Sequence, residues 1–165
     1  MNHYYYLRAQ LPHLRFGDPP PIDSEKLVAE AKKWLTPEEF LILEKLDFKG
    51  TKLHGSEPEP VKKYINFEKE LREELVAWRE GRDEGTEHKP SLFNVGLLKE
   101  GTPLDREKNL LKLRWDFIEE LQAGRYFDYA ALLFYALKLQ IVEKLDEYDS
   151  DLGMEKFKHY TEVSL

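Results

Sequence analysis

The hydrophobic residues of segment 110–145 recur at the spacing of an α-helix and predict a helical hairpin. In the first half of the segment, apolar side chains form two neighbouring rows along one helix face. These rows contain Leu110, Leu113, Phe117 and Leu121, and Leu111, Trp115 and Ile118. Gly124 can adopt the left-handed conformation that commonly ends a helix, and Asp128 can cap the next one. Residues 129–137 are then apolar on every side except for two tyrosine hydroxyls, which is typical of a buried central helix.

Capping residues mark the start of further helices. Asp23 or Ser24 can cap a helix that extends to about residue 35. Thr36 is followed by a proline and then by Glu39, three residues after the threonine, which is the pattern of a capping box. The same logic recurs at Thr102, directly before the hairpin. We therefore expect each of these polar residues to satisfy free backbone amides at a helix start.

Segment 61–80 has the clearest amphipathic pattern of the chain. One helix face carries Tyr64, Phe67, Leu71, Leu75 and Trp78. Glu68 and Arg72 have the i, i+4 spacing of an ion pair, and we expect them on the solvent side. Residues 81–90 are charged and contain glycine and proline, which indicates a mobile loop.

The two ends of the chain have weaker patterns. Residues 4–7, three tyrosines and a leucine, predict a short strand or an irregular arm with its rings buried on the core. An exposed aromatic patch that binds a partner is the alternative. Residues 146–151 predict an acidic loop, and residues 152–163 predict a last helix that packs back on the core.

These patterns together predict an all-α fold of about six helices, built around the C-terminal hairpin. We expect a single compact helical domain over residues 1–165, because this length suffices for one hydrophobic core. A two-lobe arrangement stays open, with lobes at residues 1–80 and 91–165 joined by a mobile loop.

Composition narrows the possible partners and compartments. The chain has 25 Lys and Arg against 32 Asp and Glu, a formal net charge of -7, which argues against nucleic acid as a partner. It has no cysteine, so disulfides and cysteine-based zinc sites are excluded. Neither a secretory signal nor a membrane span is evident, and we expect a cytoplasmic protein.

The sequence contains no recognisable catalytic constellation. The histidines never occur at i, i+4, neighbouring glutamates point in different directions on a helix, and glycine-rich phosphate loops are missing. We therefore expect a non-catalytic protein without a cofactor or metal. A metal-dependent hydrolase whose acids converge only in the fold is an alternative, and it requires at least three facing carboxylates or histidines.

Lys138 interrupts the most apolar helix and is the polar residue that most needs an explanation. Its stem can lie on apolar surface while the amine reaches solvent, or it can pair with an acid such as Asp116 or Glu143. A contact that a partner completes is the functional alternative.

Two groups of residues are familiar from a known family. Near the start they are Tyr4-Tyr5-Tyr6-Leu7, Leu11-Pro12 and Phe16-Gly17-Asp18, and in the hairpin they are residues 113–121, Tyr126-Phe127-Asp128 and Tyr135-Ala136-Leu137-Lys138-Leu139. They resemble an uncharacterised bacterial family, domain of unknown function family 2764. This resemblance implies an association with V-type ATPases, because genes of that family lie within bacterial V-type ATPase operons.

A second resemblance is to the connector protein of the archaeal and vacuolar-type ATPases, the helical component that joins the central stalk to the membrane rotor ring. Residues 135–138 and the tyrosines before Arg8 are similar to patterns in that connector. The two resemblances imply a non-catalytic subunit or assembly factor, held at the inner face of the membrane only through its partners. A reduced version of the connector is one form that this role can take.

Trp115, Tyr135 and Lys138 are the candidate partner contacts, because they belong to the residues that carry the resemblance. We nevertheless expect Trp115 and Tyr135 to be buried in the core. The alternative to an ATPase component is a free-standing helical adaptor or regulatory protein with no ATPase role.

Overall fold

The computed structural model describes residues 3–50, 52, 55–85 and 89–163, with side chains placed from residue 4 to residue 151 of these ranges. The described residues form seven helices and no strand, which confirms the predicted all-α fold. The helices are α1 (His3–Gln10), α2 (Ser24–Lys32), α3 (Pro37–Lys45), α4 (Glu59–Asp83), α5 (Gly96–Lys99), α6 (Pro103–Gln122) and α7 (Tyr129–Val163).

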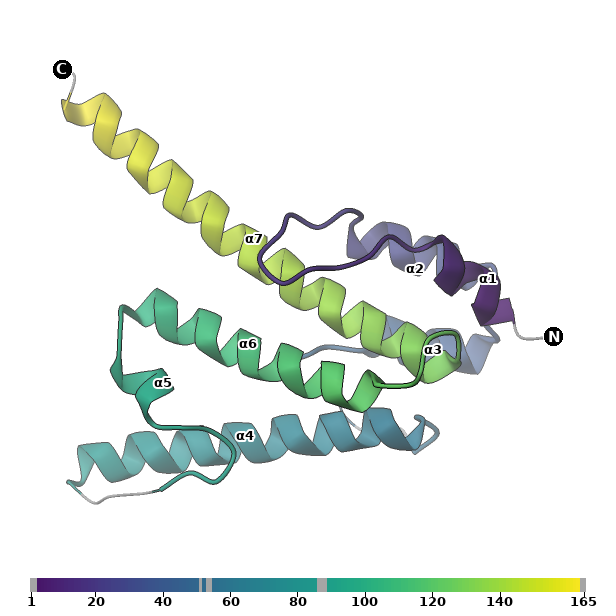
Figure 1. Cartoon of the computed structure of the whole chain (residues 1–165), viewed down its shortest axis with the longest axis horizontal. Helices are drawn as coiled ribbons and strands as arrows, with labels where there is room; N and C mark the ends of the chain where they lie inside the picture. Colours follow the sequence, from purple (N-terminus) through teal and green to yellow (C-terminus); the bar gives the residue numbers. More distant parts are fainter. Residues whose placement is uncertain (1–2, 51, 53–54, 86–88, 164–165) are drawn as a thin grey trace.

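Helix α7 lies at the centre of the arrangement. It runs antiparallel to α6, and α4 lies along the other side of α6, with the short α5 beside the start of α6 (Figure 1). Helices α1 and α2 pack on α7 as well, and α3 packs on α2. The helical hairpin of α6 and α7 is therefore the element against which both halves of the chain are placed.

The most apolar helix is also the most buried one, as its pattern predicts. Every residue from 130 to 139 of α7 is buried, and Leu132, Leu133 and Leu137 have no exposed surface. One hydrophobic cluster extends from Leu7 in α1 to Leu145 in α7. Burial of each large apolar side chain contributes roughly 1.5 to 3 kcal/mol, so this cluster dominates the stability of the fold.

The predicted helix caps are present. The side-chain oxygen of Asp23 accepts from the Lys26 amide, at 2.7 Å, so Asp23 rather than Ser24 caps α2. Thr36 and Thr102 each form a complete capping box, with Glu39 and Asp105 respectively. In the hairpin turn, Gly124 has a φ of 80° and Asp128 Oδ1 accepts from the Ala131 amide at 2.8 Å.

The amphipathic pattern of α4 correctly predicts its buried face, but not its polar side. The five apolar residues of the predicted stripe are all buried, and the helix extends a few residues beyond the predicted segment at each end. Glu68 does not lie on the solvent side: it is 2% exposed, and Arg72 remains only a distant partner at 3.8 Å. The carboxylate instead faces α6, where it pairs with Arg114. Because that partner is distant in sequence, the helical spacing could not reveal it.

The N-terminal segment is a helix and not the predicted strand or irregular arm. Its residues 4 and 7 share one helix face, so Tyr4 and Leu7 can both contact α7. Packing of this face outweighs the preference of consecutive tyrosines for strands. The helix ends at Gln10 because Pro12 disfavours helical geometry in the residue before it.

The predicted acidic loop at residues 146–151 is also absent, because α7 continues through it to Val163. This stretch contains neither proline nor glycine, and aspartate and serine weaken a helix only slightly. The last turns of α7 project past the other helices (Figure 1). In the predicted loop 81–90, the helix persists to Asp83, and residues 86–88 lie outside the described part of the chain. Within the described helices, none combines the length and the apolar character needed to cross a lipid bilayer.

Candidate protein-interaction surface

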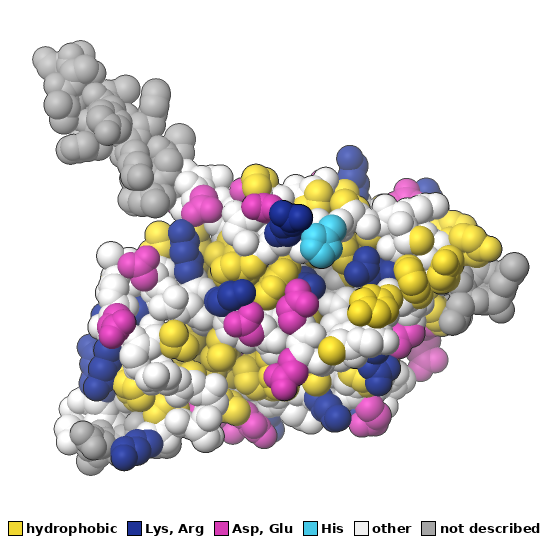
Figure 2. All heavy atoms as spheres, in the orientation of Figure 1, with side chains coloured by type: hydrophobic (Ala, Val, Ile, Leu, Met, Phe, Trp, Pro, Cys, Tyr) yellow, Lys and Arg dark blue, Asp and Glu magenta, His cyan; other side chains and the backbone are white. Residues whose placement is uncertain are grey.

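Four exposed aromatic rings gather where α1 meets the turn between α6 and α7. Tyr5 and Tyr6 are each 49% exposed, Tyr126 is 65% exposed and Phe127 is 44% exposed. We call these four residues the aromatic surface. Figure 2 shows hydrophobic side chains gathered over the α1 end of the molecule. Such clustered exposed rings mark interaction surfaces, since isolated apolar side chains are common on a protein but contiguous patches are not.

The geometry of α1 explains why these rings point outward. Successive residues of a helix are rotated by about 100°, so the inward position of Tyr4 leaves Tyr5 and Tyr6 on other sides. The Tyr5 ring lies 4.6 Å from the Phe127 ring, measured between centroids, and 5.9 Å from the Tyr6 ring. Tyr6 is in turn stacked on Trp34 at 6.3 Å. These contacts hold the rings in fixed positions, which lowers the entropy lost on binding a partner.

A polar network anchors α1 behind this surface. The Tyr4 hydroxyl donates to the carboxylate of Glu39 in α3, and the Tyr129 hydroxyl donates to the Glu39 carbonyl oxygen at 2.8 Å. The hydrogen bond to Glu39, together with burial, raises the pKa of Tyr4 to about 12. Burial alone would raise the pKa of Glu39, but hydrogen bonds from Tyr4 and Thr36 outweigh burial and lower it. Glu39 therefore joins α1, α3 and α7 in its charged form.

Tyr135 fastens the segment after α1 to α7. Its hydroxyl donates to the Pro12 carbonyl oxygen at 2.7 Å, and burial raises its pKa to about 12. The Arg8 guanidinium lies over the Tyr135 ring, 4.8 Å from the centroid. Burial lowers the pKa of Arg8, and its Nε has no hydrogen-bond partner among the described residues. The cation is thus held by the ring face rather than by an acid.

Lys138 is buried between α7 and α6. Its Nζ donates to Glu119 Oε1 at 2.7 Å and to Gln122 Oε1 at 3.3 Å, and it lies 4.6 Å from the centroid of the Trp115 ring. The lysine side chain is 9% exposed, whereas the Glu119 side chain is 51% exposed. The amine therefore reaches the edge of the solvent through its partner.

The structure places the predicted contact residues inside the protein. Tyr135 is 2%, Trp115 is 5% and Lys138 is 7% exposed, which confirms the expected burial of the two aromatic residues. Lys138 does pair with an acid, but with Glu119 rather than with Asp116 or Glu143; Asp116 pairs with Lys112 at 3.0 Å. A partner role for these three residues stays a prediction.

The sequence pattern predicts buried rings at residues 4–6, and this is correct only for Tyr4, which is partly buried. The exposure of Tyr126 and Phe127 was not predicted either. The available signal was their position between Gly124 and Asp128, where a tight turn leaves large side chains no helix face to join.

Within the described residues, no three side chains of His, Cys, Asp or Glu come together in a way that could hold a metal ion. Their carboxylates are engaged in caps and ion pairs such as those of Glu39, Glu68 and Glu119.

Comparison with known proteins identifies a family but no close relative. No curated protein and no solved structure matches the chain. A family model described as "Protein of unknown function (DUF2764)" matches residues 61–163, from the first turn of α4 to the end of α7. The matched region includes Trp115, Tyr126, Phe127, Tyr135 and Lys138, and it leaves out α1. Because the match covers more than half of the 165 residues, the chain belongs to the DUF2764 family.

Proposed function

We propose that this protein is a non-catalytic helical subunit or assembly factor of a bacterial V-type ATPase, and that it binds other subunits through the aromatic surface. The observation that carries the binding role is the set of four half-exposed rings on α1 and the α6–α7 turn. Tyrosine and other aromatic residues are enriched at protein interfaces, because they bury a large area with few rotatable bonds.

The link to the ATPase rests on the family resemblance and not on a contact seen in this chain. A connector between a rotating stalk and a membrane ring must transmit force, so it must be stiff and must present complementary surfaces. The fold supplies both features: α4, α6 and α7 pack along their lengths, and the aromatic surface lies at one end of this bundle. Attachment to the membrane would follow from the partners alone.

Affinity purification of the tagged full chain from its native cells tests this proposal. The decisive variant is Tyr126→Ser combined with Phe127→Ser, because both side chains are exposed and their removal should change the free energy of unfolding by only about 0.5 kcal/mol or less. We expect stalk or rotor-ring subunits to copurify with the wild-type chain in a fixed ratio and to be lost with the variant.

Val76→Ser is the matched control. Val76 is 51% exposed on α4, away from the aromatic surface, so its replacement removes a similarly exposed apolar side chain without affecting the four rings. Copurification should survive this change. If the wild-type chain comes out alone at both low and moderate salt, it is not a stable subunit. If other, identified proteins copurify instead, the free-standing adaptor is the better description.

A further inference from the structure

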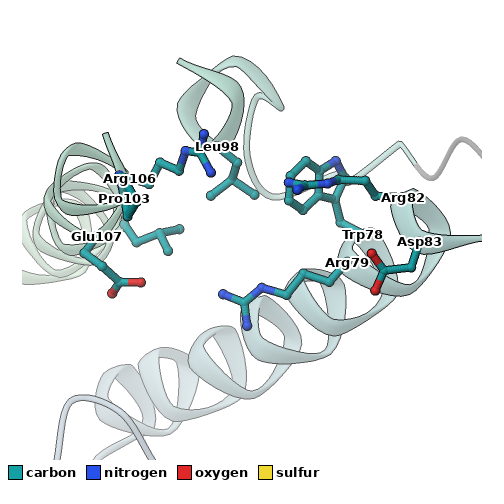
Figure 3. A pocket seen from close by; sticks show the side chains of 9 residues that line it. Trp78, Arg79, Arg82, Asp83, Leu98, Pro103, Arg106 and Glu107 are labelled. Carbon is teal, nitrogen blue, oxygen red and sulfur yellow. The ribbon is translucent and has the colours of Figure 1, made fainter. Parts of the chain in front are cut away.

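A pocket of about 350 Å³ lies between α4, α5 and α6. Helix α4 contributes Trp78, Arg79 and Arg82, and the first turns of α6 contribute Arg106 and Glu107. Figure 3 shows that the guanidinium ends of Arg79 and Arg106 approach the central space from these two helices. The hairpin turn with the aromatic surface lies at the other end of α6, which at 20 residues is about 30 Å long. The pocket is thus separate from the proposed protein-binding surface.

The three arginines of this pocket have unused hydrogen-bond donors. Among the described residues, none of Arg79, Arg82 and Arg106 forms an ion pair or a side-chain hydrogen bond. The Nε of Arg106 is moreover buried without a partner. A buried donor of a charged group that lacks an acceptor is unfavourable, and an oxyanion that accepts from Nε and a neighbouring Nη would satisfy it.

Trp78 holds one of these arginines in place. The Arg82 guanidinium lies over the Trp78 ring at 5.6 Å from the centroid, and the tryptophan is itself buried at 8% exposure. This cation–π contact restricts the side chain before any ligand arrives. The ring face is therefore occupied by Arg82, which argues against a ligand that stacks on the tryptophan.

Two carboxylates, of Asp83 and Glu107, line the same pocket and select among anions. Three arginines and two carboxylates leave a net charge of about +1, so a ligand must offer acceptors to the guanidinium groups and preferably a donor to a carboxylate. A phosphate group meets both needs, because near neutral pH it retains a proton part of the time. Sulfate has the acceptors but no such proton.

We propose that this pocket binds a phosphate group, either free or at the end of a small organic phosphate. The volume of about 350 Å³ lies within the range of small-molecule sites, which leaves room for a group beyond the phosphate itself. The arginine forks supply the charge and the directional hydrogen bonds, as they do in other phosphate sites.

Isothermal titration calorimetry of the full chain at constant ionic strength tests the site with inorganic phosphate, glycerol 3-phosphate and sulfate. We expect saturable binding of at least one of the two phosphates and weaker binding of sulfate. The tighter of the two phosphate probes identifies whether the free ion or an organic phosphate is the better ligand.

Variants connect this binding to the pocket. Arg79→Gln and Arg106→Gln should each weaken phosphate binding roughly tenfold or more, because each removes a charge-assisted hydrogen bond. Arg79 is exposed, so its replacement leaves the fold intact even if that of Arg106 does not. Arg15→Gln is the matched control, since Arg15 is an exposed arginine outside the pocket, and it should leave the affinity unchanged.

Two results would overturn the proposal. One is the absence of saturable binding with both phosphates. The other is binding that sulfate matches and that Arg79→Gln leaves unchanged, which indicates an adventitious ion only. Neither result bears on the aromatic surface, and failed copurification of ATPase subunits does not affect the pocket.

Discussion

Helix α6 forms one ion pair with each of its two long neighbours, and the two pairs differ in their exposure to water. Arg114 of α6 binds Glu68 of α4 through two hydrogen bonds, from Nε to Oε2 at 2.7 Å and from Nη2 to Oε1 at 3.1 Å, and both side chains are almost fully buried. Glu119 of α6 binds Lys138 of α7 through one bond, and half of the Glu119 side chain faces solvent.

This difference separates a fixed joint from an adaptable one. The planar guanidinium of Arg114 fits the Glu68 carboxylate in one geometry, so this pair sets the register of α4 against α6. Loss of either partner leaves a buried charge without compensation. Glu119, in contrast, can turn into water when its partner is lost, and apolar packing supplies the main contact between α6 and α7.

The largest expected effect is from breaking the buried pair. Arg114→Leu or Glu68→Leu alone should lower the free energy of unfolding by about 3 to 5 kcal/mol, since each leaves one buried charge unpaired. Urea denaturation of the variants measures this loss. The double variant should recover most of it, because two leucines leave no buried charge. A double variant whose loss equals the sum of the two single losses would show that the two residues are not coupled.

The next effect tests the adaptable joint. Lys138→Met keeps an unbranched side chain over Trp115 but removes the amine, and it should cost about 1 to 2 kcal/mol. The loss is smaller than at Arg114, because Glu119 is then free to hydrate and only Gln122 is left with a buried acceptor. The same denaturation measurement checks it. A loss as large as that of Arg114→Leu would remove the distinction between the two joints.

Lys138→Glu is a poor probe of partner binding for the same structural reason. It would place a carboxylate next to Glu119 in a buried position, so the chain would lose stability whether or not a partner contacts it. Exposed residues such as Tyr126 and Phe127 allow binding to be tested without this complication.

The two joints also show what the sequence could reveal. Capping at Thr36, Thr102 and Asp128 and the apolar stripe of α4 were predictable, because each depends on residues three or four positions apart. The pair of Glu68 and Arg114 spans 46 positions, and no periodic pattern connects them. Glu68 even has a plausible local partner in Arg72, which directed the prediction to the wrong side of the helix.

The candidate sites were harder to predict than the fold for a similar reason. The buried set of Trp115, Tyr135 and Lys138 could be singled out from the hairpin pattern, but the aromatic surface combines rings from α1 with rings from a turn more than 100 positions later. The arginine pocket likewise needs Arg79 and Arg106 on two different helices. Chain folding, and not local spacing, brings these residues together.

Salt should distinguish the joints with a smaller effect. Glu119→Gln retains an acceptor for Lys138 but removes the charge, and the expected loss is about 0.5 kcal/mol at low salt because the carboxylate is half exposed. This loss should shrink in about 1 M salt, where charges at the surface are screened over roughly 3 Å. The loss caused by Glu68→Leu should hardly change in the same denaturation series. Equal salt dependence of the two losses would contradict the difference in burial.

The smallest effect extends the comparison to Glu39, a third polar joint, which responds to pH. Its pKa is lowered from the ordinary value of 4.5 in the folded chain, so the charged form contributes stability that is fully present above pH 4.5 and is lost as the pH falls through the lowered folded value. The stability difference between wild type and Glu39→Gln should therefore be largest near neutral pH and should narrow below pH 4.5. Glu38→Gln is the control, because this neighbouring carboxylate is exposed and should give a smaller, flatter difference. Thermal unfolding between about pH 3 and pH 7, a range that spans the carboxylate titration, measures both differences. If wild type and Glu39→Gln lose stability in parallel across this range, the bonds from Tyr4 and Thr36 do not favour the charged carboxylate, and α1 is held on α3 and α7 by ring packing alone.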